Sequence, residues 1–172
     1  MKSILSFICC LLFAVPAFSS DLSIVILKTD RRIEVFRGKQ KIHSFRVGLG
    51  NAPVGDKERS GDGKTPEGTF YVCVKNPQSR FYLSLGISYP DATDAERGLR
   101  EGIISRKEQD RIVAAQEKKA TPSWNTALGG EIFIHGNGSS SDWTLGCIAL
   151  DDAEMKILFD LIDVGTVVEI RP

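Results

Sequence analysis

Short segments rich in β-branched and aromatic residues open the chain after residue 21 and indicate strands. The first three cover residues 22–27, 33–36 and 41–47. A polar turn over residues 37–39 joins the second to the third, so we predict an antiparallel meander. Beyond a glycine-rich loop, two more strands are indicated, at residues 69–74 and 166–170.

Helical patterns are confined to the middle and the end of the chain. A hydroxyl residue followed three positions later by glutamate, the capping-box pattern, occurs at residues 93–96 and 105–108. A third helix is expected to begin at Asp151, because apolar residues follow it at helical spacing. The pattern therefore predicts a mainly β domain of α+β type, with a helical insertion over about residues 91–120 and one helix after residue 150.

Composition narrows the class of protein. A length of 172 residues suits a single domain with its own core. Hydrophobic residues make up 42% and charged residues 26%, which is ordinary for a globular protein and excludes disorder or a fibrous repeat. Lysine plus arginine (22) balances aspartate plus glutamate (22), so charge gives no reason to expect nucleic-acid binding.

The N-terminus has the pattern of a secretory signal peptide. Lys2 precedes an apolar run over residues 4–15, and small residues follow at the positions that determine cleavage. We predict a signal peptide over residues 1–19 and a mature domain over residues 22–172. The apolar run is shorter than the roughly 20 residues that a transmembrane helix needs. The expected location is therefore periplasmic or secreted, with no membrane span after cleavage.

Two cysteines, Cys73 and Cys147, remain after cleavage, in a compartment that favours disulfides. One interpretation is therefore a structural domain with a Cys73–Cys147 bridge. The surroundings of Cys147 favour a second one. A short apolar strand over residues 131–134 leads to His135, and a polar loop then returns the chain to apolar sequence beside Cys147. The ends of such a loop can bring imidazole and thiol together.

A thiol next to an imidazole is a recurrent nucleophile. A free thiol with a pKa near 8.5 is mostly protonated at neutral pH, and the thiolate is the form that attacks carbonyls. His135 would remove the proton as general base and return one to the leaving amine. Gly146 permits a backbone that a side chain would block, and the Gly146 and Cys147 amides are candidate oxyanion donors. A structural histidine and a core cysteine are the alternative.

A metal site is disfavoured by the same residues. Structural zinc takes four protein ligands and catalytic zinc three. The mature chain offers only two cysteines, two histidines and scattered carboxylates. We therefore expect neither a metal nor another cofactor.

Three motifs, in order, resemble the YkuD-type L,D-transpeptidases. They are Lys-Thr-Pro-Glu-Gly-Thr-Phe over residues 64–70, Ile-His-Gly over residues 134–136, and Thr-Leu-Gly-Cys over residues 144–147. The resemblance covers roughly residues 22–170. It implies a β-sandwich catalytic domain, Cys147 as nucleophile and His135 as base. It also implies peptidoglycan stem peptides as the substrate and partner, acylating Cys147 as a thioester.

Two departures from the family pattern bear on the reaction. Leu145 stands where the usual Ser/Thr-His-Gly-Cys signature has histidine, which leaves His135 as the one imidazole expected beside Cys147. Apolar residues 148–150 replace the polar or basic residue that usually follows the cysteine. The second departure removes an expected anchor for a substrate carboxylate, which leaves the acyl donor and acceptor open. An L,D-carboxypeptidase or amidase on the same substrates and a non-catalytic cell-wall binding domain are the alternatives to a transpeptidase.

Further residues are predicted to bind substrate. Those in the loop before the cysteine are Gly136, Asp142, Trp143 and Thr144, and those after the strand at residues 69–74 are Arg80 and Tyr82. Several have a structural alternative: a loop aspartate commonly stabilises a turn, and an aromatic residue commonly anchors a long loop. The insertion over residues 91–120 is either a lid over the cleft or a packing element.

Overall fold

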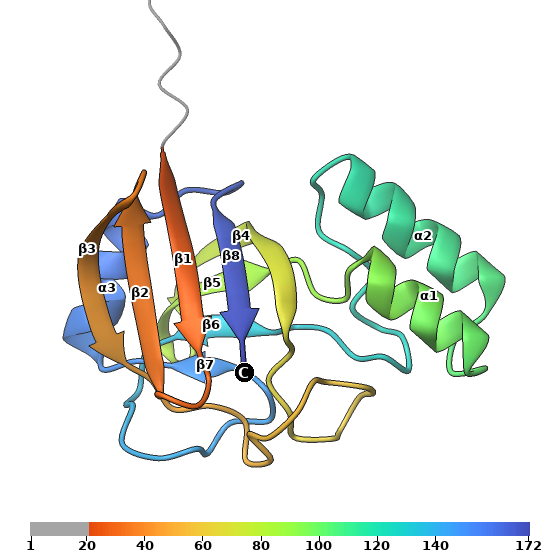
Figure 1. Ribbon diagram of the computed structural model, residues 1–172, viewed down its shortest axis with the longest axis horizontal. Helices are drawn as coiled ribbons and strands as arrows, with labels where there is room; N and C mark the ends of the chain where they lie inside the picture. The colour runs from red at the N-terminus through yellow and green to blue at the C-terminus, as the bar shows by residue number, and fades with distance from the viewer. Residues whose placement is uncertain (1–20) are drawn as a thin grey trace, which may run out of the picture.

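The structure is a computed structural model that describes residues 21–172, so the signal peptide predicted over residues 1–19 lies outside the described residues. Eight strands form one continuous sheet in the order β3-β2-β1-β8-β4-β5-β6-β7 (Figure 1). The strands are β1 Leu22–Leu27, β2 Arg32–Arg37, β3 Gln40–Arg46, β4 Gly68–Ser79, β5 Tyr82–Ile87, β6 Phe133–His135, β7 Ile148–Ala149 and β8 Val167–Arg171. The helices are α1 Ala92–Arg100, α2 Arg106–Glu117 and α3 Asp152–Leu161. The predicted mainly β class is confirmed.

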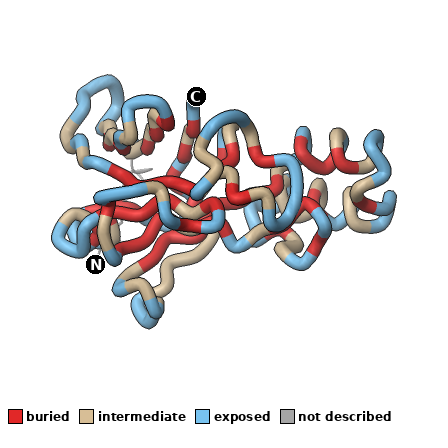
Figure 2. Tube along the Cα trace, turned by 90° about the horizontal axis from the view of Figure 1, so that it is seen from below, coloured by how far each residue is buried: buried red, intermediate tan, exposed pale blue. Residues whose placement is uncertain are grey.

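The sheet is curled, and β4 is the strand that turns it. The first residues of β4 pair with β8, and from Val72 onward β4 pairs with β5, with irregularities in register. The predicted meander β1-β2-β3 is antiparallel, and β8 joins it parallel to β1. Buried residues of both halves form one core (Figure 2). The two layers of the predicted sandwich are thus the two halves of a single bent sheet.

The sequence analysis did not identify strand β5, Tyr82–Ile87. Leu83, Leu85 and Ile87 alternate there with Ser84 and Gly86, a pattern that fits a strand. β5 pairs with β4 on one side and with β6 on the other. The local pattern and the tertiary pairing therefore agree at this strand.

The helical insertion is an antiparallel hairpin beside the sheet, on the opposite side of the molecule from α3 (Figure 1). The capping box predicted at Ser105 and Glu108 is present. The box predicted at residues 93–96 is wrong, because Asp91 is the N-cap of α1 and Asp94 is its partner. Aspartate is as good an N-cap as threonine, and Asp91 stands at the end of the preceding turn. The hairpin has its own small core of Ala95, Ile104, Ile112 and Leu128.

Candidate active site

The parallel pairing of β6 with β7 brings the two predicted catalytic residues together. Ile134 pairs with Ile148 and His135 with Ala149. One residue earlier in this register, Cys147 lies opposite Phe133. Because side chains alternate between the faces of a sheet, Cys147, Phe133 and His135 share one face. The sequence analysis expected the loop to bring its two ends close together, and the parallel pairing of β6 with β7 is the arrangement that does so.

The imidazole of His135 is buried and held in one tautomer. Its Nδ1 lies 2.7 Å from the carbonyl oxygen of Gly136. A carbonyl oxygen only accepts, so the proton of the neutral ring is on Nδ1 and Nε2 is left with a lone pair. Phe81 stacks on the ring at 4.7 Å between centroids, and Trp143 meets it edge-on at 5.6 Å. Burial lowers the pKa of His135, against the opposing effect of the Gly136 hydrogen bond.

The thiol of Cys147 is half-buried and bonded to the backbone. Its Sγ accepts from the Phe133 amide at 3.4 Å and donates to the Glu131 carbonyl at 3.6 Å. Burial raises the pKa of the Cys147 thiol, while the Phe133 amide and the charges of Lys57 and Arg80 act in the opposite direction. Together with the lowered pKa of His135, this shift describes a neutral thiol beside a neutral imidazole, not a preformed ion pair.

Two cavities meet at this pair of residues. The first has a volume of about 400 Å³ and the second of about 510 Å³. Cys147, His135, Arg80, Phe81 and Glu131 line both. The first cavity is completed by Asn76, Ser79, Ser84 and Phe133. The second is completed by Lys57, Ser60, Gly61, Gly129, Gly130, Ile132, Trp143, Thr144 and Leu145. The thiol is therefore open to both cavities.

Gly146 has the conformation that the sequence anticipated, but its amide is already bonded. Its φ is +131°, and a Cβ at this position would lie 2.7 Å from the Lys64 carbonyl oxygen, which excludes a side chain there. The Gly146 amide donates to the Thr144 hydroxyl at 3.1 Å, and that hydroxyl donates to the Cys147 carbonyl at 2.8 Å. Thr144 thus fixes the turn that carries Cys147, while it also lines the second cavity.

Asp142 stabilises the loop without reaching either cavity, whereas Trp143 also lines one of them. Arg31 binds the Asp142 carboxylate through Nε and Nη2 at 2.7 to 3.0 Å, and the Leu49 amide donates to it at 2.9 Å. Although burial alone would raise it, these hydrogen bonds hold the pKa of Asp142 below its usual value. Asp142 lines neither cavity and stabilises the loop. Trp143 donates to the Gly138 carbonyl at 3.1 Å and also lines the second cavity.

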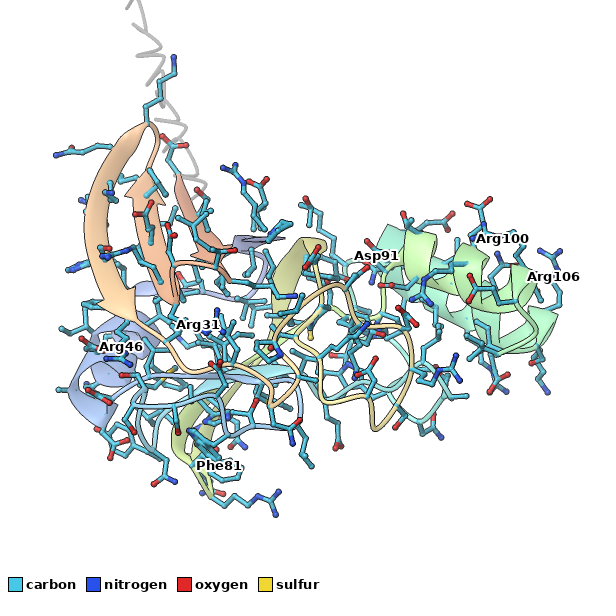
Figure 3. The ribbon with its side chains drawn as sticks, turned by 60° about the horizontal axis from the view of Figure 1, so that its bottom comes forward. Arg31, Arg46, Phe81, Asp91, Arg100 and Arg106 are labelled. Atoms are coloured by element: carbon cyan, nitrogen blue, oxygen red, sulfur yellow. The ribbon has the colours of Figure 1, made fainter. Side chains whose placement is uncertain are left out.

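Of the residues predicted near the end of β4, the structure brings Arg80 to the site but not Tyr82. The guanidinium of Arg80 lies 4.9 Å from the centre of the Phe81 ring, which itself stacks on His135. Figure 3 shows Phe81 at the lower side of the molecule, where β5 begins. Tyr82 is exposed and lines neither cavity. Gly136 lies behind His135, where an added Cβ would be 2.5 Å from Asp152 Oδ1, so its contribution is the carbonyl that orients the imidazole.

Sequence reasoning missed Phe81, Glu131 and Lys57. Phe81 precedes the strand that was not identified, and its register on His135 depends on the β5–β6 pairing. Glu131 has a φ of +54°, so its carbonyl reaches the thiol through a backbone conformation that the sequence does not announce. Lys57 is buried at 2% exposure in a loop whose charged composition indicates a solvated segment.

The structure of residues 21–172 bears on the disulfide and on the metal site considered above. Cys73 and Cys147 are both free, which contradicts the bridged structural domain. Within residues 21–172, no group of three or more His, Cys, Asp or Glu is arranged to hold a metal ion. None of the helices in this part of the chain has the length and apolar character to cross a membrane.

Comparison with known proteins identifies the class that this fold and site define. The family model of the L,D-transpeptidase catalytic domain (YkuD) matches residues 21–170, so the chain belongs to this family. The resemblance carried by the motifs is confirmed. YafK of Escherichia coli (strain K12), whose name describes it as an L,D-transpeptidase, is 33% identical to this chain over 86 residues. The match covers 46% of this chain and 35% of YafK.

Solved structures agree on the fold. The helical cell shape determining protein Pgp2 of Campylobacter jejuni superposes with a TM-score of 0.60 at 23% identity, covering 87% of this chain and 47% of Pgp2. Bd1075 of Bdellovibrio bacteriovorus does so with a TM-score of 0.57 at 23% identity, covering 88% of this chain and 48% of Bd1075. The chain thus spans less than half of the length of these relatives.

Proposed function

We propose that this protein is an exported, peptidoglycan-modifying cysteine acyltransferase that acts on stem peptides through a thioester on Cys147. The observation that carries the proposal is the shared lining of two cavities by Cys147 and by a His135 whose Nε2 is left unprotonated. Membership of the L,D-transpeptidase family supports the substrate class. The predicted signal peptide and the cell-wall substrate support a periplasmic or secreted location.

The proposed first half-reaction starts from the neutral pair. His135 Nε2 takes the proton from Cys147 as Sγ attacks the carbonyl carbon of a stem-peptide amide, so charge separates only when substrate is bound. Of the candidate oxyanion donors, we assign the Cys147 amide, because the Gly146 amide is engaged by Thr144. The C–N bond then breaks, and His135 returns the proton to the departing amine. A thioester and a free amine result.

The second half-reaction releases the acyl group from Cys147 and regenerates the free thiol. An amine acceptor attacking the thioester gives a transpeptidase, whereas water gives an L,D-carboxypeptidase or an amidase, according to which amide was cleaved. The second cavity favours an acceptor other than water alone, because about 510 Å³ of space lies against the same thiol. Arg80, which lines both cavities, is the proposed partner for a substrate carboxylate.

Incubation with defined disaccharide tetrapeptides, followed by mass spectrometry of the products, tests this function. A crosslinked dimer or an exchanged terminal residue is expected for a transpeptidase. Loss of the terminal residue alone identifies the carboxypeptidase, and release of a larger amine identifies the amidase. Unchanged substrate in every mixture, with folded protein, would support the non-catalytic cell-wall binding domain instead.

A further inference from the structure

The hairpin α1–α2 lies next to the second cavity without lining it. None of the residues that line either cavity belongs to residues 92–117. Two of the segments that wall this cavity are of interest: the first wall contains Lys57, Ser60 and Gly61, and the second wall contains Gly129 to Glu131. The first wall contacts the hairpin through Arg97, and Leu128, which precedes the second wall, packs into the hairpin core. The hairpin therefore supports the walls of the cavity and does not cover it as a lid would.

Arg97 on α1 connects the hairpin to the first wall. Its Nη2 donates to the Lys57 carbonyl at 3.1 Å and its Nη1 to the Glu58 carbonyl at 3.2 Å. Nη2 also lies 3.0 Å from Oδ1 of the buried Asp94. Burial, with the charge of Asp91, raises the pKa of Asp94, while the hydrogen bond from Arg97 acts in the opposite direction. The two carbonyl contacts do not titrate.

The first wall is a compact loop organised around Asp62. The Asp62 carboxylate accepts from the Lys57 ammonium at 2.7 Å and from the amides of Glu58, Arg59 and Lys64 at 2.8 to 3.1 Å. These bonds shape the loop internally. They do not fix the position of the loop relative to α1. The two hydrogen bonds from the Arg97 guanidinium, which form a fork, fix that position.

The second wall is held between the hairpin and the first wall. Leu128 packs into the small core of the hairpin, where a Cβ added to Gly98 would be 2.9 Å from Leu128 Cδ2. The Tyr89 hydroxyl donates to the Leu128 carbonyl at 3.0 Å. The Ser60 amide donates to the Ala127 carbonyl at 2.9 Å, which joins the two walls.

We propose that Arg97 is a positioning residue that sets the second cavity of the active site through the Lys57–Glu58 carbonyls, so that it governs binding in that cavity without acting on the thiol. The inference rests on the proposed function for the identity of the ligand. The geometry on which it depends, a guanidinium fork between helix α1 and the cavity wall, is independent of that function.

Matched variants on α1 separate positioning from general stability. Arg97→Met keeps an unbranched stem and removes the guanidinium fork, whereas Arg97→Lys keeps the charge and one donor direction. Arg100→Met is the control, since Arg100 is on the same helix and Figure 3 shows it on the outer part of the hairpin, away from Phe81. All variants are compared at the same pH.

Three readouts test the proposal. Hydrogen exchange of the Ser60 amide is expected to accelerate at least tenfold in Arg97→Met and by less in Arg97→Lys, with strand β6 unchanged. Alkylation of Cys147 by iodoacetamide is expected to stay within twofold of wild type. With a disaccharide tetrapeptide, KM is expected to rise about tenfold in Arg97→Met and to change less than twofold in Arg100→Met.

The outcomes are separable. Ser60 exchange that matches wild type in Arg97→Met would overturn the positioning role, whether or not the tetrapeptide is a substrate. A parallel loss of iodoacetamide reactivity, or of protection in β6, would show a general structural role instead. Absence of turnover by wild type would count against the proposed function alone, because the exchange measurement needs no substrate. If Arg97→Met does not fold, Arg97→Lys gives a comparison in the same direction with a smaller expected change, and Ser60 exchange equal to wild type in Arg97→Lys then overturns the positioning role.

Discussion

The surroundings of the two thiols, Cys73 in β4 and Cys147 before β7, differ in one respect that matters for chemistry. Both cysteines are free and half-buried, and burial raises the pKa of each. Cys73 donates to the Gly86 carbonyl at 3.4 Å and lines neither of the cavities at the site. Cys147 opens to two cavities and shares them with an imidazole. Reactivity is therefore assigned by access and by a neighbouring base, and not by the resting pKa of the thiol.

Removing the base should produce the largest change in this comparison. We expect His135→Gln to lower turnover by about 10²- to 10⁴-fold, the usual contribution of general acid–base catalysis. Alkylation of Cys147 by iodoacetamide at pH 7 should slow as well. The control His43→Gln removes an imidazole that stacks on Phe45 in the sheet and should leave both rates unchanged. Equal alkylation of wild type and His135→Gln would identify another activating group.

The pH profile of the same alkylation reports the resting charge state of the pair. Because burial raises the pKa of Cys147 and lowers that of His135, both groups are neutral at rest. The alkylation rate of Cys147 should therefore rise steadily as the pH increases beyond neutrality. A rate that reaches a plateau below pH 7 would indicate a preformed thiolate–imidazolium pair and would contradict the neutral resting state.

A smaller effect is expected when the turn before Cys147 is disturbed. Gly146→Ala places a Cβ 2.7 Å from the Lys64 carbonyl oxygen at a positive φ, so the free energy of unfolding should fall by about 3 kcal/mol. Gly102→Ala is the control, since Gly102 also has a positive φ but a Cβ added there would meet nothing within 4 Å. It should cost about 1 kcal/mol. Urea unfolding measures both, and equal losses would show that the contact with Lys64 is unimportant.

The smallest effect on activity is expected at the other thiol. Cys73→Ser should leave turnover within a few-fold of wild type and lower the free energy of unfolding by about 1–3 kcal/mol if the hydroxyl lacks a full set of partners. Turnover and thermal unfolding, measured on the same preparation, check the two parts. A loss of turnover comparable to that of His135→Gln would assign Cys73 to the reaction and would remove the distinction between the two thiols.

Local pattern was sufficient for the meander, for the existence of the hairpin helices and for the choice of Cys147 and His135 as a candidate pair, although the cap predicted for α1 was wrong. Strand β5 was overlooked even though Leu83, Leu85 and Ile87 alternate with Ser84 and Gly86, and Phe81 on the His135 ring was missed with it. The bonding of Asp142 to Arg31, 111 positions away, and the positive φ of Glu131 arise only from the folded chain.

Mass spectrometry tests the proposed covalent intermediate on Cys147 most directly. Wild-type protein mixed with a disaccharide tetrapeptide and quenched in acid within milliseconds should show an intact-mass increase equal to the substrate minus its leaving amine. Peptide mapping should place this adduct on Cys147, and Cys147→Ala should carry none while Cys73→Ser carries it fully. An adduct on another residue, or product formation by Cys147→Ala, would contradict a reaction through the Cys147 thioester.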